Sequence, residues 1–461
     1  MTRFEQESAW GRLLSDGGGA NVRGGVRGDS PGVRDPAEPG AMEEHRSVHD
    51  APSGALERRL LAVGHSVRTF AGPIVLLDCL LGFLFMWAGY PITATLPGGV
   101  AAAVAVIAVG VFRPSTLKVK WGSLLFLLGM ALLVFLVVVS MLNGQPWTQR
   151  IGKFALLLLL CSVLATGRIN VRSLVIGGCL GAVVNVPLFY AGLTPNNYPP
   201  YLTGFYGDKN VAGLYYVVWG ILGLLALRGR FTSLAWIVVS FGLLFATGSR
   251  TSIAAYLGAL AWLAFRNRVG VSYRLIYAAL GLVTLTWAVN NLAESKVFGD
   301  RTGSDWYREQ VELAMQAKAD ITPWYGLGLN EGQVVIGTRP QWFHDSYVQA
   351  FVEGGYPNLW IVTGAFLLLG VGLLDRRLHI SRELLVAEGA TIAMMVCAWK
   401  LGETLMTPAA FLILGIAVAY RLGTPIERDD VWAWQHLELL PDNGAVEHLS
   451  TEDRSGQGVK A

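Results

Sequence analysis

The chain has 461 residues, of which 53% are hydrophobic and 15% charged, and its mean hydropathy is +0.45. A soluble chain carries about a quarter charged residues. The acidic residues are also unevenly spread, because residues 70–420 hold only 15 Asp and Glu, eight of them between Glu294 and Asp345. This composition excludes a soluble enzyme, a nucleic-acid-binding protein and a secreted disulfide scaffold.

The two ends of the chain are predicted to be cytoplasmic tails. Residues 1–69 begin with a stretch rich in Gly, Arg, Asp, Glu and Pro. Such a stretch cannot bury enough apolar surface to offset the entropy lost on ordering, so we expect an N-terminal tail that is disordered. Residues 423–461 are acidic and polar, and they predict a C-terminal tail.

Twelve apolar segments lie between the tails. Lipid offers the backbone no hydrogen-bond partner, so each segment that crosses a membrane should be helical. The sequence therefore predicts an all-α, polytopic membrane protein with about 12 transmembrane helices: spans 1–9 in residues 70–292 and spans 10–12 in residues 346–422. The predicted segments are 71–90, 98–112, 121–142, 151–166, 171–193, 210–227, 232–247, 250–265, 273–292, 346–374, 383–400 and 404–421.

Lys and Arg in the short connections predict the orientation. With both termini in the cytoplasm, 13 Lys and Arg fall in the inner loops and five in the outer connections. The positive-inside rule favours this direction. The five Lys and Arg of the short outer connections run against the bias and are Arg150, Lys153, Lys209, Arg250 and Lys400.

Residues 293–345 form a long polar segment that this topology places outside the membrane as an extracytoplasmic loop. A connection of this length usually has a function. Within it, residues 304–319 predict a helix that Ser304 caps, with apolar residues at 307, 311, 314 and 315 on one stripe. The sequence Gly326-Leu-Gly-Leu-Asn330 follows, and we expect a turn that lets the backbone pass close to a substrate. The helix is expected to lie across the bundle as a partial lid.

Three polar motifs stand at the predicted outer starts of spans six, eight and ten. They are Gly207-Asp-Lys-Asn210, Gly248-Ser-Arg-Thr251 and His344-Asp-Ser346. Asp208, Ser249 and Asp345 are of the types that cap helices, and each helix start directs free N–H groups and its positive dipole end outward. With Lys209, Arg250 and His344 added, the three starts predict a site for a polyanion, in particular a diphosphate.

Simpler interpretations of these motifs stay open. Arg250 at a membrane boundary can extend to lipid phosphates, Lys209 and Asn210 can belong to an ordinary turn, and a histidine beside an aspartate is often structural.

Further candidates come from other charged residues near the outer helix ends. Arg150 and Lys153 are expected to add a second anion contact, and Lys400 and Glu403 to pair with each other. Glu353, about two turns into span ten, should face the bundle interior, where an ionisable group is usually functional or paired. Asp78 in span one is interpreted as a helix–helix hydrogen bond.

The motifs together resemble the O-antigen ligase and O-antigen polymerase family of bacterial membrane glycosyltransferases. The resemblance covers roughly residues 200–370. It depends on Gly204-Phe-Tyr-Gly-Asp-Lys-Asn-Val-Ala-Gly213, Thr247-Gly-Ser-Arg-Thr251, Gly326-Leu-Gly-Leu-Asn330 and His344-Asp-Ser-Tyr-Val-Gln-Ala-Phe-Val-Glu-Gly-Gly355. Lys209 stands where family members often have Pro, and Asp345 where they often have Asn.

The resemblance implies transfer of a glycan from a polyprenyl-diphosphate carrier to a glycan, lipid or protein acceptor at the outer face of a bacterial cytoplasmic membrane. It implies that Arg250 holds the diphosphate and that His344 lies by the acceptor. We expect Lys209, Asn210 and Arg150 to contact the diphosphate and His344 to act as a base or to bind phosphate, oriented by Asp345 or Glu353. No Asp-x-Asp pair stands on the outer side, so we expect no metal and no cofactor. Cationic side chains are expected to take the place of a divalent ion.

The competing interpretation is a membrane transporter or a flippase for a lipid-linked saccharide. Transporters of this size often have internally repeated halves and charged residues near the bilayer midplane. The sequence shows no such repeat, and its polar motifs gather at one predicted surface. Among the glycosyltransferases, the sequence leaves ligase, polymerase and protein-glycosylating variants open.

Overall fold

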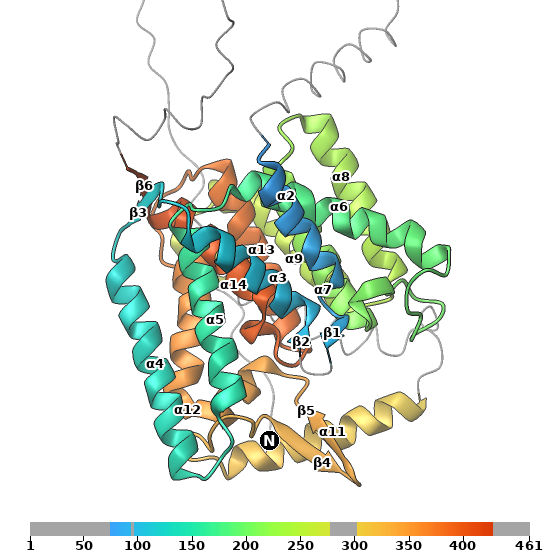
Figure 1. The fold of residues 1–461 in the computed structure, drawn as a ribbon, viewed down its shortest axis with the longest axis vertical. Helices are drawn as coiled ribbons and strands as arrows, with labels where there is room; N and C mark the ends of the chain where they lie inside the picture. The colour runs from blue at the N-terminus through green and yellow to red at the C-terminus, as the bar shows by residue number, and fades with distance from the viewer. Residues whose placement is uncertain (1–73, 94–95, 277–301, 427–461) are drawn as a thin grey trace, which may run out of the picture. The chain divides into compact units, whose positions relative to one another are not determined.

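The computed structural model of the protein describes residues 74–93, 96–276 and 302–426, all of which belong to one compact unit, Arg59–Ala461. The predicted N-terminal tail, most of the C-terminal tail and most of segment 273–292 lie outside the described residues. The described part is mostly helical (Figure 1). Its α-helices are α2 (Leu76–Phe83), α3 (Gly98–Val111), α4 (Gly122–Leu142), α5 (Thr148–Ala165), α6 (Val171–Tyr190), α7 (Lys209–Leu222), α8 (Arg230–Ala246), α9 (Arg250–Phe265), α11 (Thr302–Asp320), α12 (Ser346–Ala365), α13 (Arg382–Ala398) and α14 (Pro408–Leu422).

Short 3-10 and π-helical turns extend or connect these helices. They are η1 (Leu84–Trp87), η2 (Gly204–Tyr206), η3 (Gly223–Leu225), η4 (Arg266–Arg268), the π-helical η6 (Phe366–Val371) and η7 (Thr404–Met406). Each predicted apolar segment other than 273–292 coincides with a helix, so hydropathy located the helices correctly.

Three short antiparallel strand pairs were not predicted. They are β1 (Pro91–Thr93) with β2 (Leu96–Pro97), β3 (Leu117–Val119) with β6 (Gly423–Pro425), and β4 (Gln333–Ile336) with β5 (Arg339–Trp342). The β4–β5 hairpin places Gln333 opposite Trp342 and Ile336 opposite Arg339. It lies directly before His344, so the hairpin fixes where the chain enters α12.

Four of the described helices are long and apolar enough to cross a membrane, by length and composition: Gly122–Leu142, Thr148–Ala165, Val171–Tyr190 and Ser346–Val371. They indicate a membrane protein. The shorter apolar helices are Leu76–Trp87, Gly98–Val111, Lys209–Leu225, Arg230–Ala246 and Pro408–Leu422. A total of about 12 crossings therefore stays a prediction.

The hydrophobic core lies around α7, α13 and α14. In α7 every residue from Ala212 to Leu222 is buried, and α14 is buried from Leu412 to Ala419. Helix α13 packs against α7, α9 and α14, and α5 packs against α14. By contrast, only 22% of the apolar stretch of α4 is buried. Helix α4 therefore lies at the edge of the bundle.

Helix α12 is broken directly after Glu353. Gly354 and Gly355 have non-helical backbone angles, and Gly355 has φ +63°. A side-chain carbon at Gly355 would lie 1.9 Å from the Trp324 carbonyl oxygen, so only glycine fits here. The break frees the carbonyls of Val352 and Glu353, which accept hydrogen bonds from Leu327 N at 2.7 Å and Gly328 N at 3.1 Å.

This contact changes the interpretation of Gly326-Leu-Gly-Leu-Asn330. A side-chain carbon at Gly326 would lie 2.6 Å from Gly355 N. Leu329 N also donates to Ser140 Oγ at 2.8 Å, which attaches the turn to α4. The backbone of the turn approaches broken α12 in the structure, and its expected approach to a substrate stays a prediction. Its glycines therefore serve a helix–loop contact.

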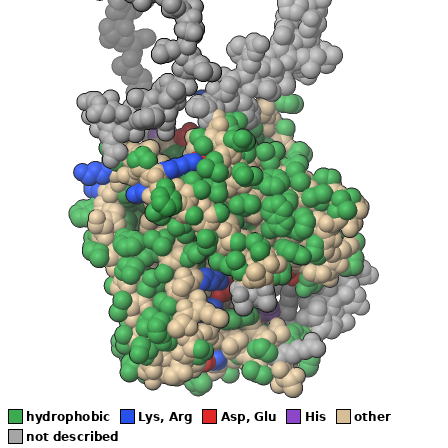
Figure 2. All heavy atoms as spheres, viewed as in Figure 1, with side chains coloured by type: hydrophobic (Ala, Val, Ile, Leu, Met, Phe, Trp, Pro, Cys, Tyr) green, Lys and Arg blue, Asp and Glu red, His purple; other side chains and the backbone are tan. Residues whose placement is uncertain are grey.

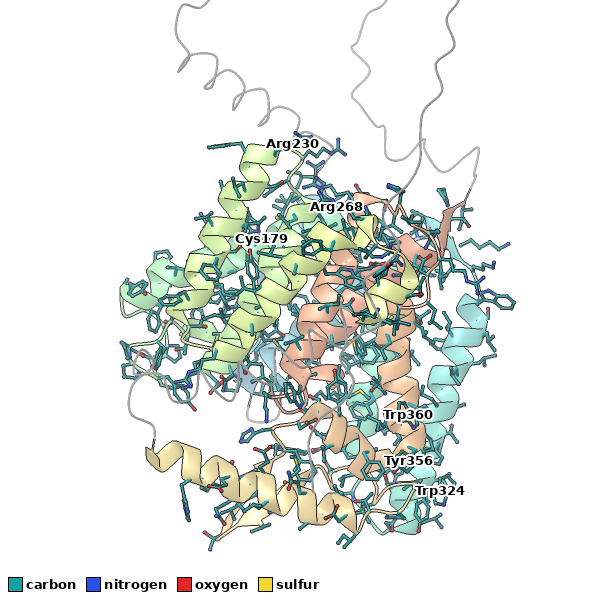
Figure 3. All side chains as sticks on the ribbon, turned by 180° about the vertical axis from the view of Figure 1, so that it is seen from behind. Cys179, Arg230, Arg268, Trp324, Tyr356 and Trp360 are labelled. Carbon is teal, nitrogen blue, oxygen red and sulfur yellow. The ribbon has the colours of Figure 1, made fainter. Side chains whose placement is uncertain are left out.

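Helix α11 lies crosswise at one end of the bundle in both ribbon views (Figures 1 and 3). Its predicted apolar stripe is confirmed: Val311 and Met315 are buried with Val334, Phe343 and Val352, and Tyr307 and Ala314 pack against them. The helix begins at Thr302, and the predicted cap by Ser304 lies outside the side chains that the structure describes.

Candidate functional site

Two of the three predicted caps are confirmed. Asp208 accepts hydrogen bonds from the backbone of Asn210 at 2.7 Å and Val211 at 3.2 Å, and Asp345 accepts them from the backbone of Tyr347 at 2.8 Å and Val348 at 3.1 Å. Ser249 stands at the N-cap position of α9 but makes no side-chain capping bond there. Its hydroxyl instead lies 2.8 Å from the Ser252 hydroxyl, so this prediction was wrong.

The starts of α7 and α9 lie side by side. A side-chain carbon at Gly213 would lie 2.6 Å from both Ser249 Cβ and Ser252 Oγ, so the first turns of the two helices touch. The thiol of Cys397, near the end of α13, lies 4.0 Å from Ser252 Oγ. The end of α13 therefore meets the start of α9.

The start of α12 meets the same region through the connection between α13 and α14, residues 399–407. Ser346 Oγ donates to the Leu401 carbonyl and accepts from Thr404 N, both at 2.8 Å. A side-chain carbon at Gly402 would lie 3.7 Å from the His344 Cα. The start of α12 thus contacts the connection that follows α13, the end of α13 meets the start of α9, and the start of α9 touches α7.

The rings of two tyrosines lie near the side chain of Lys209, the cation at the start of α7. Lys209 Nζ lies 5.2 Å from the ring centroid of Tyr201 and 6.0 Å from that of Tyr198. Tyr201 also packs against Gly248, where a side-chain carbon would lie 2.3 Å from its ring. Tyr201 therefore links the Lys209 motif to the motif of Arg250. Lys209, Asn210 and Arg250 are half-buried, and His344 is exposed.

Arg150 forms a buried ion network with two of the other candidates. Its side chain is 6% exposed, and Nη2 lies 2.8 Å from Glu353 Oε1, which is 2% exposed. Nη1 donates to Glu403 Oε1, and Lys153 Nζ lies 3.0 Å from Glu403 Oε2. The Trp342 ring lies 4.9 Å from the Arg150 guanidinium carbon. Arg150 was predicted to contact an anionic ligand, and here two carboxylates fill that position.

Glu403 is the more exposed of these two carboxylates, at 29%. It has a left-handed backbone with φ +59°, and its N–H donates to Gln349 Oε1 at 2.9 Å. Burial raises the pKa of Glu403, but the charges of Lys153 and Arg150 outweigh it, so the pKa lies below its ordinary value of 4.5. Glu403 is therefore a carboxylate anion held by two cations.

Asp345 has the opposite shift. Burial raises its pKa above the ordinary 3.8, although the N–H groups of Val348 and Tyr347 oppose that effect. Its Oδ1 accepts both capping hydrogen bonds. Asp345 thus has a structural function at the start of α12, in addition to its expected function of orienting His344.

Two expected pairings differ in the structure. Lys400 lies 3.5 Å from Glu312 of α11 and does not pair with Glu403, because the intervening chain is not helical and Glu403 turns toward α5. Asp78 does more than join two helices by a hydrogen bond. It forms an ion pair with Arg113 at 2.6 Å and accepts from Asn170 N at 2.7 Å.

The sequence interpretation missed several side chains of this region. Gln349 lies one turn before Glu353 on the same face of α12, and that spacing of four residues was a usable signal. Trp342, Tyr198 and Tyr201 carried no such signal, because their positions depend on the β4–β5 hairpin and on the loop before η2.

Basic and acidic side chains are exposed side by side below the middle of the face in Figure 2, and the surface around them is mostly hydrophobic or neutral. Among the residues that the structure describes, no three His, Cys, Asp or Glu side chains lie close enough together to hold a metal ion.

A second ion network lies elsewhere in the bundle. Glu388 of α13 is fully buried and accepts from Arg266 Nε at 3.0 Å and Arg421 Nη2 at 2.8 Å. Arg266 follows the end of α9, whereas Arg250 begins that helix. Figure 3 labels Arg268, in the same turn η4, at the end of the molecule opposite to Trp324. The second network therefore lies by the end of α9, whereas Glu403 of the first network follows the end of α13.

No protein-family model and no curated protein matches this chain.

Proposed function

We propose that this protein is a membrane glycosyltransferase that moves a glycan from a polyprenyl-diphosphate carrier to an acceptor at the outer face of a bacterial cytoplasmic membrane. The observation that carries the proposal is a chain of contacts among three helix starts, which bear Lys209, Arg250 and His344. The start of α7 touches α9, the start of α9 meets the end of α13, and the start of α12 contacts the connection that follows α13. Helix starts and cations together favour a dense anionic group. The motifs that resemble the O-antigen ligase and polymerase family supply these same residues.

The proposed reaction breaks the bond between sugar C1 and the diphosphate oxygen. Negative charge grows on that leaving oxygen, so preplaced cations stabilise the transition state more than the ground state. We assign this task to Arg250, with Lys209 and Asn210 at the start of α7 beside it. The rings of Tyr198 and Tyr201 hold the Lys209 ammonium at this position.

The acceptor hydroxyl forms the new bond to C1 and must lose its proton. We assign that proton to His344, which is exposed and stands directly before the start of α12. General base catalysis of this kind contributes about 10²–10⁴-fold to the rate. Asp345 positions the segment by capping α12, and the connection that contains Gly402 lies against it.

Arg150 and Lys153 form the second part of the proposed anion site. With Glu353 and Glu403 in place, the charges of these four side chains cancel. Glu403 is the partly exposed member, so an incoming phosphate can take its place on Arg150 and Lys153 without uncovering the buried Glu353.

The test is transfer by the purified protein in lipid vesicles, supplied with a diphosphate-linked glycan and assayed separately for chain extension and for transfer to lipid or protein acceptors. We expect one of these products together with released polyprenyl diphosphate. His344→Gln should lower kcat at least about 100-fold if His344 is the base. Retained turnover with weakened donor binding would restrict His344 to binding.

A flippase or transporter is the second candidate, and one observation favours it. Two ion pairs are buried between helical elements, Arg150 with Glu353 and Arg266 with Glu388. Paired charges of this kind occur along transport pathways. Movement of a lipid-linked saccharide across vesicles, without any change in its glycan, would favour transport over transfer.

A further inference from the structure

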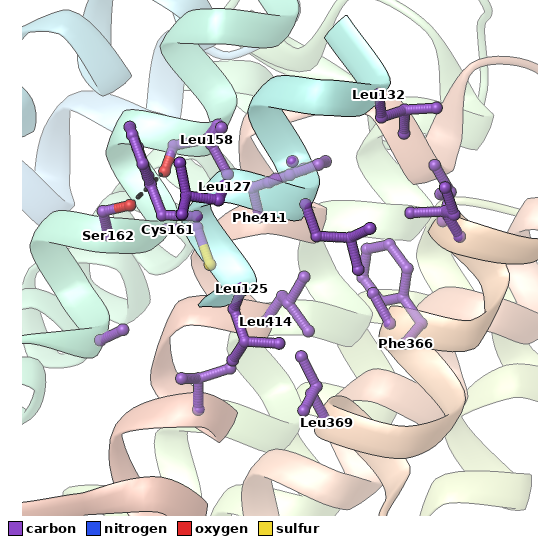
Figure 4. Close-up of a pocket in the computed structure, with 18 of the residues that line it drawn as sticks. Leu125, Leu127, Leu132, Leu158, Cys161, Ser162, Phe366, Leu369, Phe411 and Leu414 are labelled. Atoms are coloured by element: carbon purple, nitrogen blue, oxygen red, sulfur yellow. Dashed lines mark hydrogen bonds between the residues drawn. The ribbon is translucent and has the colours of Figure 1, made fainter. Parts of the chain in front are cut away.

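An apolar groove of about 810 Å³ runs along the inner side of α4. Its walls come from α4, α5, α12, η6, η7 and α14, and Figure 4 labels Leu132, Cys161, Phe366 and Leu414 among them. The hydroxyls of Ser162 and Thr166 donate to carbonyls of their own helix, Leu158 O and Ser162 O, both at 2.8 Å. These hydroxyls are therefore satisfied within α5, and the groove suits an apolar occupant.

Three walls of the groove lead directly to the Arg150 network. On α5 the lining residue Phe154 lies one turn after Arg150, whose guanidinium carbon is 5.4 Å from the Phe154 ring. On η7 the lining residue Met406 follows Glu403 by three residues. On α4 the lining residue Leu136 lies beside Gly354, the neighbour of Glu353. One end of the groove therefore meets the cations.

We propose that this groove binds the isoprenoid chain of the polyprenyl-diphosphate donor, with the diphosphate on Arg150 and Lys153 in the place of Glu403. The inference rests on the proposed function, and it adds where the carrier lipid lies. From Gly122 to Leu136 the lining of α4 spans roughly 20 Å at 1.5 Å per residue, which suits an extended chain.

Helix α4 supports a lipid as the occupant. It is apolar throughout and packs loosely, and Leu124, Leu127 and Val134 are 58%, 63% and 60% exposed. A helix of this kind faces hydrocarbon, so a chain can enter the groove sideways from the bilayer. The partly exposed cation Lys153 and the buried Arg150 then meet the phosphate end.

Two glycines make a matched pair of variants. Gly364 lines the groove and Gly242 lies in α8, away from it; a side-chain carbon at either glycine meets nothing within 4 Å. Gly364→Phe should fill the groove, and Gly242→Phe adds the same ring elsewhere. Gly364→Leu is the smaller variant if the Phe variant does not fold.

The experiment uses a photoactivatable long-chain isoprenyl diphosphate without a glycan, added to the protein in vesicles of phosphatidylcholine. We expect cross-links on α4, α5 and α14, about tenfold weaker binding in Gly364→Phe and unchanged binding in Gly242→Phe. Excess unlabelled isoprenyl diphosphate should displace the probe, and phosphatidylglycerol at the same concentration should not.

Cross-links outside the groove, or equal binding by the two variants, would overturn the inference. Equal displacement by phosphatidylglycerol would overturn it too, because the groove would then hold ordinary phospholipid. Glycan transfer by the wild type is measured separately. If the wild type transfers glycan and Gly364→Phe binds the probe as well as the wild type does, only the groove assignment is removed. If the probe labels the groove but the wild type transfers no glycan, only the glycosyltransferase assignment is removed.

Discussion

At the scale of single residues, Arg150 and its two carboxylate partners form a largely buried charge cluster. A buried ion pair is expensive to break on one side, because the remaining charge stays in the low-dielectric interior. Glu353 is 2% exposed, whereas Glu403 is 29% exposed. The two glutamates should therefore respond very differently to mutation.

Glu353→Ala should lower the free energy of unfolding by about 3–5 kcal/mol, since it leaves Arg150 buried with a single partner. Unfolding in detergent, followed by tryptophan fluorescence, measures this loss. The control is Glu312→Ala, which removes the more exposed pair with Lys400 and should change stability by at most about 1 kcal/mol. Equal losses in the two variants would show that Glu353 contributes no more to stability than the exposed Glu312 does.

Glu403→Gln should strengthen the binding of inorganic pyrophosphate, because it removes the anion that competes for Arg150 and Lys153. An increase of about tenfold in affinity is expected, measured by calorimetry on the purified protein. Weaker binding would mean that Glu403 holds the two cations in their binding positions and does not compete for them.

The stability of the protein should also depend on the charge of Glu403. Its pKa in the folded protein lies below the ordinary 4.5, so its contribution is present above that value and is lost as the pH falls through the folded pKa. The melting temperature of the wild type should therefore fall more than that of Glu403→Gln between about pH 5 and pH 3. Parallel curves would place the pH dependence on other carboxylates.

At the scale of elements, hydropathy located the helices but not their irregularities. Glu353 was expected in a continuous span, yet the break at Gly354 and Gly355 depends on a contact with Trp324, which is 31 residues away from Gly355 in the sequence. Such a long-range contact leaves no periodic signal. The β4–β5 hairpin is local, since Ile336 pairs with Arg339 across a two-residue turn, but its strands of four residues are too short to give a clear alternating pattern.

The ion pairs also could not be predicted from the sequence. Lys400 and Glu403 are three residues apart, a spacing at which side chains meet only on a helix. The chain between α13 and α14 is not a continuous helix, and Glu403 has a left-handed backbone. The caps were easier to predict, because Asp208 and Asp345 contact backbone groups within three residues of themselves.

Gly355→Ala tests the break in α12. The new carbon would lie 1.9 Å from the Trp324 carbonyl oxygen at a φ of +63°, so we expect a loss of more than about 2 kcal/mol or failure to fold. Gly364→Ala in the same helix, in open space, should be neutral or stabilising by up to about 1 kcal/mol. Denaturant unfolding of both variants compares them, and equal stability would contradict the need for glycine at 355.

At the scale of the whole molecule, the proposed function requires the two ends of the bundle to lie on opposite sides of the membrane. Asn197 and Val335 are exposed near the proposed site, and Arg268 is exposed beyond the far end of α9. Single cysteines at Asn197 and Val335 should react with an impermeant maleimide on intact spheroplasts, and one at Arg268 only after permeabilisation. Labelling of Arg268→Cys together with the other two would contradict the predicted topology.

Transfer itself tests the central claim most directly. Arg250 begins α9 in the proposed site, and Arg268 follows the same helix at its other end, so the two arginines are matched in charge and differ in location. In vesicles supplied with diphosphate-linked glycan and acceptor, the wild type and Arg268→Gln should form product and release polyprenyl diphosphate at similar rates. Arg250→Gln should be at least about 100-fold slower, the usual cost of losing a charge-stabilising group. Equal rates in all three proteins, or no product from the wild type with any acceptor, would contradict the account.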